Sequence, residues 1–343
     1  MSLISPLVQK PDLMSKFRFW FLVYPDISKA IGGVKQIHRV AEGLIQLGHQ
    51  AYLVQESIDF HPGWFNSSVP TIDKLTWDQS ILNPKSDYIV IAETFIPILK
   101  TLQPKIKKII FNQNGAYSFG LPGNQIFKPS WLISAYSDPS VAQIWCVSHH
   151  DYDLLVHGFR IAASRVYLLV NALEVFPPLP TICSKVNSIA YMPRKNILDY
   201  SVVIELLSRQ PYLDGWEFVP IKNMNHENVI STLLMSSLFL SFGHPEGFGL
   251  PVAEAFACGC SVIGFSGLGG RELFHRAKLY NACYEVEFGD WLNFVKGVSF
   301  FCDQIKSNHD DWYSRSFRLS QEIRTQYHPE KLLQSIDIAL SYL

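Results

Sequence analysis

Two runs of alternating strand-like and helix-like segments constrain the fold of this 343-residue chain more than any other feature. In the first run, strand-like segments rich in apolar residues cover 16–25, 51–56, 88–93, 107–114, 143–148 and 165–173. Between the first two, apolar residues recur at helical spacing from Val34 to Leu47, and Gly48 closes the predicted helix. A strand, a helix and a strand in succession predict parallel pairing, because parallel strands need such a crossover.

The alternation stops at "VFPPLP" (175–180), whose prolines form a stiff connector, and then restarts. Predicted strands follow at 187–193, 216–221, 238–243 and 260–266, with predicted helices at 200–210, 225–237 and 251–259. We therefore expect an α/β protein with two doubly wound, Rossmann-like domains that face each other across a cleft. The expected units are an N-terminal domain (1–174), a C-terminal domain (175–315) and a C-terminal helix (316–343) that could pack on either domain.

Composition excludes several classes of protein. The formal net charge is −1, which does not suit a nucleic-acid binder, and 48% of residues are hydrophobic, as in a globular protein. No apolar run approaches the roughly 20 residues of a membrane-spanning helix, and the N-terminus does not resemble a signal peptide. Six scattered cysteines, without histidines at zinc-finger spacing, predict reduced thiols and no metal site. We expect a cytoplasmic protein and leave contact with the inner face of a membrane open.

The stretch "HPEGFGLPVAEAFACGCSVIG" (244–264) carries the strongest functional signal. Pro251 suits the first position of a helix, so the backbone amides of 247–250 lie at or just before a helix start. Glycines at 247 and 249 let the backbone approach a ligand closely. Free amides at the positive end of a helix dipole favour an anion, most naturally a phosphate.

Two acids, Glu246 and Glu254, flank this expected anion site. A carboxylate about 4 Å from a phosphate would be repelled by about 4 kcal/mol at an effective dielectric constant near 20. We therefore expect both acids to accept hydrogen bonds from hydroxyl groups instead, because a carboxylate can bind both hydroxyls of a vicinal diol. A ligand with diols on both sides of a diphosphate is a nucleotide sugar.

These residues carry a resemblance to a known family. "PEGFGLPVAEAFACGCSVIG…GLGGRELF" resembles the donor-site signature of retaining glycosyltransferases with the GT-B fold, especially family 4 (glycosyl transferases group 1), and Glu246 and Glu254 match its E-x7-E spacing. "GGVKQIHRVAEGLIQLGHQAYLV" is similar to the family's first-domain opening. "CVSHHDYDLL" and "LVNALEVF" resemble later first-domain segments.

The resemblance implies a role for each matching residue. Glu246 would contact the transferred sugar, and Glu254 would bind the ribose hydroxyls. Arg194 and Lys195 would neutralise the diphosphate; they are adjacent, whereas the family's two cations commonly lie several residues apart, so one is free to point away. The remaining donor contacts would be backbone or side-chain groups of Gly32, Gly33, Asn114, Gly247, Phe248, Gly249 and Leu250.

One departure concerns the histidine that many members carry at the end of a first-domain strand. This chain has "FNQNG" there, so neutral side chains of Asn112, Gln113 or Asn114 would take its place. The resemblance implies no cofactor and no metal, since the nucleoside-diphosphate sugar is a substrate. The acceptor would be a carbohydrate, a lipid-linked molecule or a small molecule.

Several segments have alternative interpretations. "DYD" (151–153) could bind a metal, but its place after Ser148 favours the first turn of a helix. "KIKK" (105–108) could meet a membrane surface or an acidic acceptor, although a solvated loop is favoured. The aromatic residues of the first-domain loops could stack on an acceptor or simply pack in the core: Trp64, Phe65, Tyr117 and Phe119.

Two other functions remain open at this stage. A retaining glycoside hydrolase would use two carboxylates about 5–5.5 Å apart, but it has no use for a glycine-rich helix start between them. A non-catalytic nucleotide-sugar-binding protein or partner subunit agrees with the missing histidine, although the paired glutamates argue against it.

Overall fold

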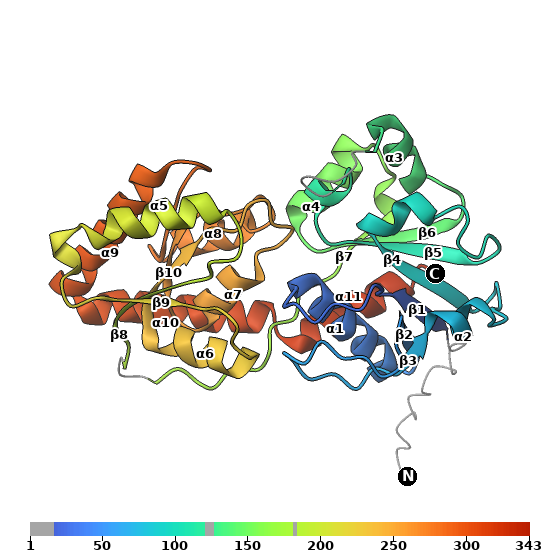
Figure 1. Cartoon of the computed structure of the whole chain (residues 1–343), viewed down its shortest axis with the longest axis horizontal. Coiled ribbons are helices and arrows are strands. Elements are labelled where there is room, and N and C mark those ends of the chain that lie inside the picture. Colours follow the sequence, from blue (N-terminus) through green and yellow to red (C-terminus); the bar gives the residue numbers. More distant parts are fainter. Residues whose placement is uncertain (1–16, 121–126, 181–183) are drawn as a thin grey trace, which may run out of the picture.

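The computed structural model describes residues 17–120, 127–180 and 184–343. It has two lobes that lie side by side, each built on one parallel sheet (Figure 1). The expected fold class, two doubly wound α/β domains, is confirmed. The predicted strands and helices all overlap observed ones. Residues 1–16 of the expected first domain lie outside the described part of the chain.

The first sheet has seven strands in the order β3-β2-β1-β4-β5-β6-β7. Its strands are β1 (Arg18–Leu22), β2 (Gln50–Gln55), β3 (Thr71–Asp73), β4 (Asp87–Ala92), β5 (Lys107–Asn112), β6 (Val141–Cys146) and β7 (Val166–Leu168). The main helices of this lobe are α1 (Gly32–Gln46), α2 (Lys74–Asp78), α3 (Pro129–Tyr136) and α4 (His149–Asp153). Alternate side chains of β1 fill opposite faces: Phe19 and Phe21 pack with α1, whereas Trp20 and Leu22 pack with α2 and α3.

The second sheet has five parallel strands in the order β12-β11-β10-β8-β9. They are β8 (Val186–Tyr191), β9 (Glu217–Pro220), β10 (Ser236–Ser241), β11 (Ser261–Gly264) and β12 (Cys283–Glu285). One face is covered by α6 (His226–Met235), α7 (Leu250–Ala257), α8 (Arg271–Lys278) and α10 (His309–Gln326), and the other by α5 (Ile197–Ser208) and α9 (Trp291–Ser307).

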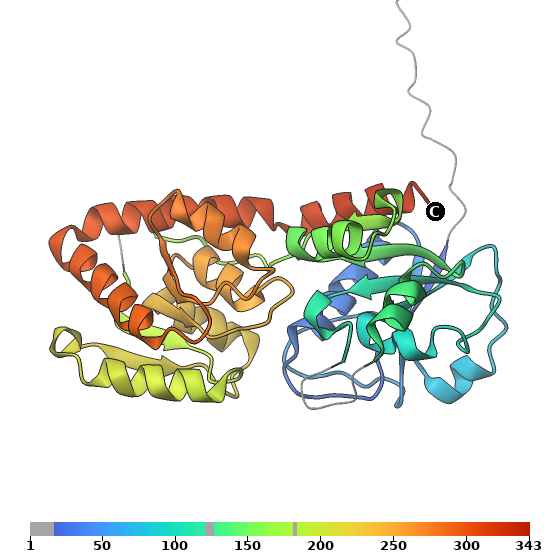
Figure 2. The ribbon, with the colours of Figure 1, turned by 90° about the horizontal axis from the view of Figure 1, so that it is seen from above.

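The chain ends with α11 (Pro329–Leu340), which packs against α1 of the first lobe. Gln143 donates to the Ala339 carbonyl at 2.7 Å, which ties α11 to β6. Figure 2 shows α10 and α11 following each other along one side of both lobes. The single helix expected from residue 316 is therefore wrong: α10 begins at His309, and a break at His328–Pro329 separates two helices. The break follows from the proline, which disfavours helical backbone at the residue before it.

Two further expectations can be compared with the structure. Lys108 does not lie in a solvated loop, because it belongs to β5, is fully buried and donates from Nζ to the Gln103 carbonyl at 3.0 Å. The cysteines among the described residues are all free thiols, and Cys183 lies outside that part of the chain. Within the described residues, no helix is both long enough and apolar enough to cross a membrane.

Candidate functional site

The site lies where the carboxyl ends of both parallel sheets face each other, which is where open α/β sheets bind ligands. The loop after β10 enters α7 through Gly249, whose φ of 91° favours glycine. Val252 and Ala253 bond back to the Gly249 carbonyl, so the turn closes directly onto the helix. Among the described residues, no acceptor is hydrogen-bonded to the amides of 247–250. The expected set of free amides at a helix start is therefore present.

A second loop from the same domain fixes Glu246. Glu246 donates its backbone N–H to the Gly267 carbonyl, and Gly269 donates to the Glu246 carbonyl at 3.0 Å. A side chain at Gly269 would place its Cβ 1.7 Å from the Gly247 carbonyl oxygen, so only glycine allows the two loops to lie this close. The "GLGG" segment is thus the turn before α8, and it also supports the loop that carries Glu246.

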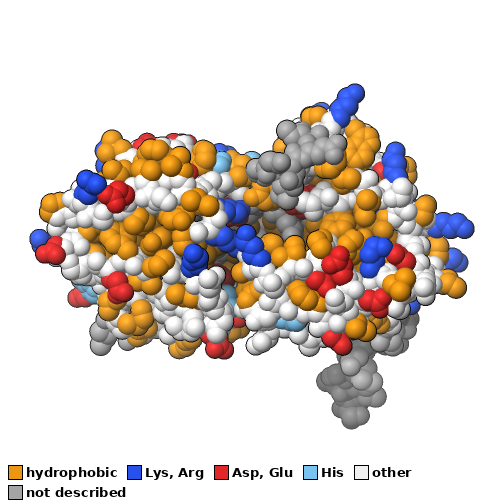
Figure 3. Space-filling view, in the orientation of Figure 1, with side chains coloured by type: hydrophobic (Ala, Val, Ile, Leu, Met, Phe, Trp, Pro, Cys, Tyr) orange, Lys and Arg blue, Asp and Glu red, His pale blue; other side chains and the backbone are white. Residues whose placement is uncertain are grey.

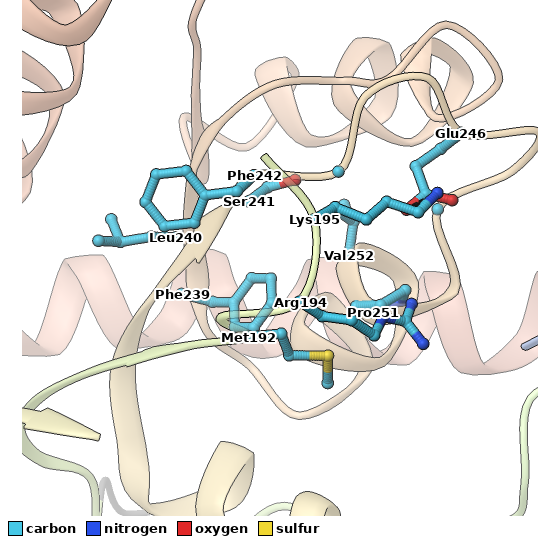
Figure 4. A pocket seen from close by; sticks show the side chains of 12 residues that line it. Met192, Arg194, Lys195, Phe239, Leu240, Ser241, Phe242, Glu246, Pro251 and Val252 are labelled. Carbon is cyan, nitrogen blue, oxygen red and sulfur yellow. Dashed lines mark ion pairs between the residues drawn. The ribbon is translucent and has the colours of Figure 1, made fainter. Parts of the chain in front are cut away.

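Both expected cations line one pocket with Glu246 (Figure 4). Lys195 Nζ lies 3.0 Å from Glu246 Oε1 and 3.1 Å from the Pro245 carbonyl oxygen. Arg194 donates from Nη1 to the Ala30 carbonyl of the opposite lobe at 2.7 Å. Although the two residues are adjacent, the structure therefore brings both to the cleft. Figure 3 shows that Lys and Arg side chains gather on this face where the lobes meet.

Asn196, which sequence reasoning missed, fixes the turn that follows β8. Its side-chain amide donates to the carbonyls of Phe242 and His244, at 2.7 and 3.0 Å. Its backbone has a φ of 50°, which asparagine tolerates better than most residues. The turn after β8 and the loop after β10 are thereby joined. An asparagine directly after two cations was the available signal, but it is a weak one.

The first lobe meets this loop with "FNQNG". A Cβ at Gly247 would lie 1.7 Å from the Gln113 carbonyl oxygen, so the lobes touch through backbone at this point. Asn114 donates to the Pro245 carbonyl at 3.4 Å, and its Oδ1 accepts from the Ala116 amide. Gln113 donates from Nε2 to the Gly33 carbonyl at 2.9 Å. These neutral side chains are thus engaged in shaping the cleft and bridging it.

Of the glycine pair in the first lobe, Gly32 lies against the second lobe and Gly33 lies against Gln113 of its own lobe. A Cβ at Gly32 would be 2.9 Å from a methyl group of Leu250, and one at Gly33 would be 2.4 Å from Oε1 of Gln113. Both glycines, Asn114 and the loop 246–250 are therefore brought together. Tyr117 joins them, since Lys195 Nζ lies 5.6 Å from the centre of its ring. Phe65, in contrast, packs in the core against His38.

"DYD" forms the first turn of α4, with Ser148 accepting from the Asp151 amide at 3.2 Å. Asp151 is 1% exposed, and its carboxylate accepts from the Gly115 amide and from Asn112. Burial raises the pKa of Asp151 to about 7. The helix-start interpretation is the one that agrees with these contacts, because the carboxylate oxygens are already engaged inside the first domain.

Glu254 lies in the second turn of α7 and is 8% exposed. Its Oε1 is 2.9 Å from Nε2 of His226, a residue that sequence reasoning missed. Burial raises the pKa of Glu254, but the hydrogen bond from His226 and the positive charge of Lys35 outweigh it and hold the pKa below its usual value. The carboxylate is therefore ionised at neutral pH. Lys35 and Glu174, which also contact His226, were missed as well, because single charged residues far apart in sequence give no pattern.

Comparisons with known proteins agree with this geometry. Residues 217–310 match the family described as "Glycosyl transferases group 1", and this segment includes Glu246 and Glu254. The chain is 31% identical over 110 residues to an α-1,6-glucosyltransferase of Actinobacillus pleuropneumoniae serotype 7, which is 32% of this chain and 31% of that protein. It is 24% identical over 207 residues to a protein of Acidianus filamentous virus 2, which is 59% of each. The matches thus span less than two thirds of these curated relatives.

Solved structures match nearly the whole chain. A glycosyltransferase from Rickettsia africae has a TM-score of 0.65 at 14% identity and covers 96% of this chain and 99% of its own. Sucrose-phosphate synthase from Thermosynechococcus elongatus has a TM-score of 0.67 at 14% identity, covering 95% and 98%. The chain has the GT-B fold. The GT-B cleft of this protein accordingly lies between the loops that follow β5 and β10, as described above.

Proposed function

We propose that this protein is a retaining glycosyltransferase that moves a sugar from a nucleoside-diphosphate sugar to an acceptor hydroxyl. One observation carries the proposal: Lys195 and Glu246 pair at 3.0 Å beside Arg194, at a helix start whose amides have no acceptor among the described residues. Cations and free amides suit a diphosphate, and the nearby carboxylate suits sugar hydroxyls. The family match over 217–310 supports the same assignment.

In the proposed reaction the bond between the anomeric carbon and the diphosphate oxygen breaks, and a bond to the acceptor oxygen forms on the same face. The acceptor proton passes to an oxygen of the leaving phosphate, so no separate base is required. Arg194, Lys195 and the amides of 247–250 would offset the negative charge that develops on the diphosphate. Glu246 and Glu254 would hold the donor by its sugar and ribose hydroxyls. The proposal requires no cofactor and assigns charge neutralisation to these side chains.

The cavity at the site has a volume of about 30 Å³, which is room for a few water molecules at most, and the residues that line it all belong to the second lobe. A nucleotide sugar is far larger. Because the first lobe meets the loop beside this cavity, we propose that the lobes separate to admit the donor and then close over it. Closure would exclude water and align the acceptor with the anomeric carbon. In this closed form, Gln113 of the first lobe lies against Gly247 of the second.

The electrostatics of Glu254 argue against its use as the acid of a glycoside hydrolase. A hydrolase of the retaining type needs one carboxylic acid with a raised pKa to protonate the leaving group. The pKa of Glu254 is lowered by its paired histidine and lysine. Glu254 is therefore suited to accept hydrogen bonds from hydroxyls and unsuited to donate a proton.

The test combines donor screening with product analysis. We would incubate the full chain with α-linked UDP-, GDP- and ADP-sugars and a panel of glycan, lipid-linked and small-molecule acceptors. UDP is the first choice, because a structural neighbour from Anabaena with a TM-score of 0.62 was solved with UDP and glucose. We expect transfer, with an α-linked product identified by the proton NMR coupling constant of the anomeric hydrogen.

Three results would overturn the proposal. A β-linked product would exclude retention. Cleavage of simple glycosides without use of nucleotide sugars would favour the hydrolase. Nucleotide binding with no turnover across the whole acceptor panel would favour a non-catalytic binding protein or partner subunit.

A further inference from the structure

Four charged side chains meet at one point of the cleft, and they come from both lobes. Lys35 belongs to α1 of the first lobe, and Glu174 lies on the segment that joins the lobes. His226 begins α6 of the second lobe, and Glu254 belongs to α7. Two cations and two carboxylates therefore converge from parts of the chain that are distant in sequence, and Arg39 adds a further cation by pairing with Glu174 at 3.0 Å.

The four side chains contact one another in a closed network. Lys35 Nζ lies 2.9 Å from Glu174 Oε1, and His226 Nδ1 lies 3.4 Å from Glu174 Oε2. On its other side His226 Nε2 lies 2.9 Å from Glu254 Oε1. Lys35 Nζ is also 3.9 Å from this Glu254 oxygen and 3.1 Å from His226 Nε2. Glu174 thus holds the two cations beside each other, next to the carboxylate of Glu254.

The protonation states of His226 and Glu174 agree with this network. Burial lowers the pKa of His226, but hydrogen bonds to Glu174 and Glu254 outweigh it and raise the pKa to about 9. The hydrogen bond with His226 holds the pKa of Glu174 well below its usual value. At neutral pH the imidazolium therefore donates from both ring nitrogens, one to each carboxylate.

The two oxygens of Glu254 differ in their surroundings. Oε1 is in contact with both cations, whereas Oε2 has no hydrogen-bond partner among the described residues. The side chain of Glu254 is 10% exposed, so it has little freedom to rotate. One oxygen is thus fixed by the protein and the other is left for a ligand.

We propose that His226 and Lys35 are positioning residues that hold Glu254 by one oxygen, so that its other oxygen can accept a hydrogen bond from a hydroxyl of the donor's ribose. The inference rests on the proposed function and adds to it, because it assigns the ribose grip to a network and not to Glu254 alone. Lys35 belongs to the first lobe, so the network is complete only when the cleft is closed.

The experiment measures the discrimination between ribose and deoxyribose. Binding of UDP, GDP and ADP, and of their 2′-deoxy and 3′-deoxy analogues, would be measured by calorimetry on the full chain. The wild-type protein is expected to bind its preferred nucleotide at least about tenfold more tightly than one of the two deoxy analogues, as the loss of one charge-assisted hydrogen bond implies. This ratio reports on the ribose grip and not on general stability.

The variants are His226→Gln and Lys35→Met, with Lys35→Arg as the conservative change. We expect the first two to lose about tenfold in affinity for the ribonucleotide while binding of the deoxy analogue stays within about twofold, so that the discrimination disappears. Lys35→Arg should keep it. The matched controls are His157→Gln, at an exposed histidine–carboxylate pair, and Lys296→Met, at an exposed lysine of α9.

The outcomes separate this inference from the proposed function. Retained discrimination in His226→Gln and Lys35→Met would overturn the inference and leave the proposed function standing. A wild-type protein that binds a nucleotide but does not discriminate against either deoxy analogue would also overturn it. A wild-type protein that binds none of the nucleotides would overturn the proposed function. If Lys35→Met does not fold, His226→Gln and Lys35→Arg still decide the question.

Discussion

The two walls of the cleft are built from equivalent loops but carry different chemistry. Each wall includes a loop at the carboxyl end of a central parallel strand: 113–115 after β5 and 242–249 after β10. In the first wall Glu93 accepts from the Gln113 amide at 2.9 Å, and Asp151 accepts from the Gly115 amide at 3.1 Å. In the second wall Lys195 and Glu246 pair within the pocket itself.

The acidic residues therefore have different roles on the two sides of the cleft. Glu93 is 4% exposed, and burial raises its pKa to about 7, as it does for Asp151. Those two carboxyl groups lie behind their loop and hold its backbone in place. Glu246 and Glu254, in contrast, are paired with cations that reach the cleft. The loop after β5 therefore supplies shape through backbone and neutral side chains, whereas the loop after β10, together with Lys195, supplies charge for the proposed diphosphate-sugar donor.

Removal of the Glu246 carboxylate should have the largest effect on the rate of sugar transfer. We expect Glu246→Ala to reduce transfer about 1,000-fold, the order of loss seen when a group that stabilises the transition state is removed. Glu246→Gln should retain part of the activity, because its amide can still meet one hydroxyl. Initial rates at saturating donor, with the melting temperature as a check on folding, measure the effect. Full activity of Glu246→Ala would remove this residue from the charged wall.

The second-largest effect on transfer should come from disturbing the backbone contact between Gly247 and Gln113. In Gly247→Ala the new Cβ would lie 1.7 Å from the Gln113 carbonyl oxygen, and backbone cannot move aside as a flexible side chain can. We expect the cleft to close incompletely, transfer to fall about 100-fold and the radius of gyration from small-angle X-ray scattering to increase. Gly158→Ala is the control, since its nearest contact is a leucine methyl group at 3.1 Å. An active, compact Gly247→Ala protein would contradict a closed working state.

The two adjacent cations should differ in their effect. Lys195 contacts Glu246, whereas Arg194 contacts the Ala30 carbonyl across the cleft. We expect Lys195→Met to lose about 30-fold in transfer, which corresponds to one charge-assisted hydrogen bond of about 2 kcal/mol, and Arg194→Met to lose about fivefold. Lys195→Arg serves as the charge-conserving control. Equal losses for both methionine variants would mean that the two cations share one role.

The smallest effect on activity is expected from the titration of Glu93 in the first lobe, which changes mainly the stability of the fold. Because the pKa of Glu93 is raised to about 7, the folded chain keeps a proton that the unfolded chain releases near its ordinary pKa of 4.5. The contribution of Glu93 to stability is therefore greatest below pH 4.5 and declines as pH rises to about 7. The decline is on the order of 3 kcal/mol.

The test is urea unfolding at pH 5 and pH 8. Glu93→Gln can still accept from the Gln113 amide, so we expect it to fold, to be more stable than the wild type at pH 8 and to show a shallower pH dependence. Glu217→Gln, an exposed residue of β9, is the control. The same pH dependence in wild type and Glu93→Gln would show that Glu93 is not the group responsible.

Most of the fold could be predicted because its signals are local. Apolar runs and helical spacing lie within short segments, and they located the main strands of both sheets. β3 and β12 were not predicted, because each has only three residues, none of them fully buried, whereas the equally short edge strand β7 lies within a longer apolar run. The single C-terminal helix expected over 316–343 is wrong, because Pro329 disfavours helical backbone at His328 and so separates α10 from α11.

The proposed donor site could be placed from the sequence alone, because Glu246, the glycine turn and Glu254 lie within one segment whose spacing predicts their geometry at a helix start. Only the tertiary structure decided what surrounds them. Lys35 and His226 are separated by 191 positions, and Asp151 meets Gly115 across 36. Such contacts depend on how the two lobes and their loops pack, and an isolated histidine, lysine or aspartate carries no local pattern from which that packing could be read.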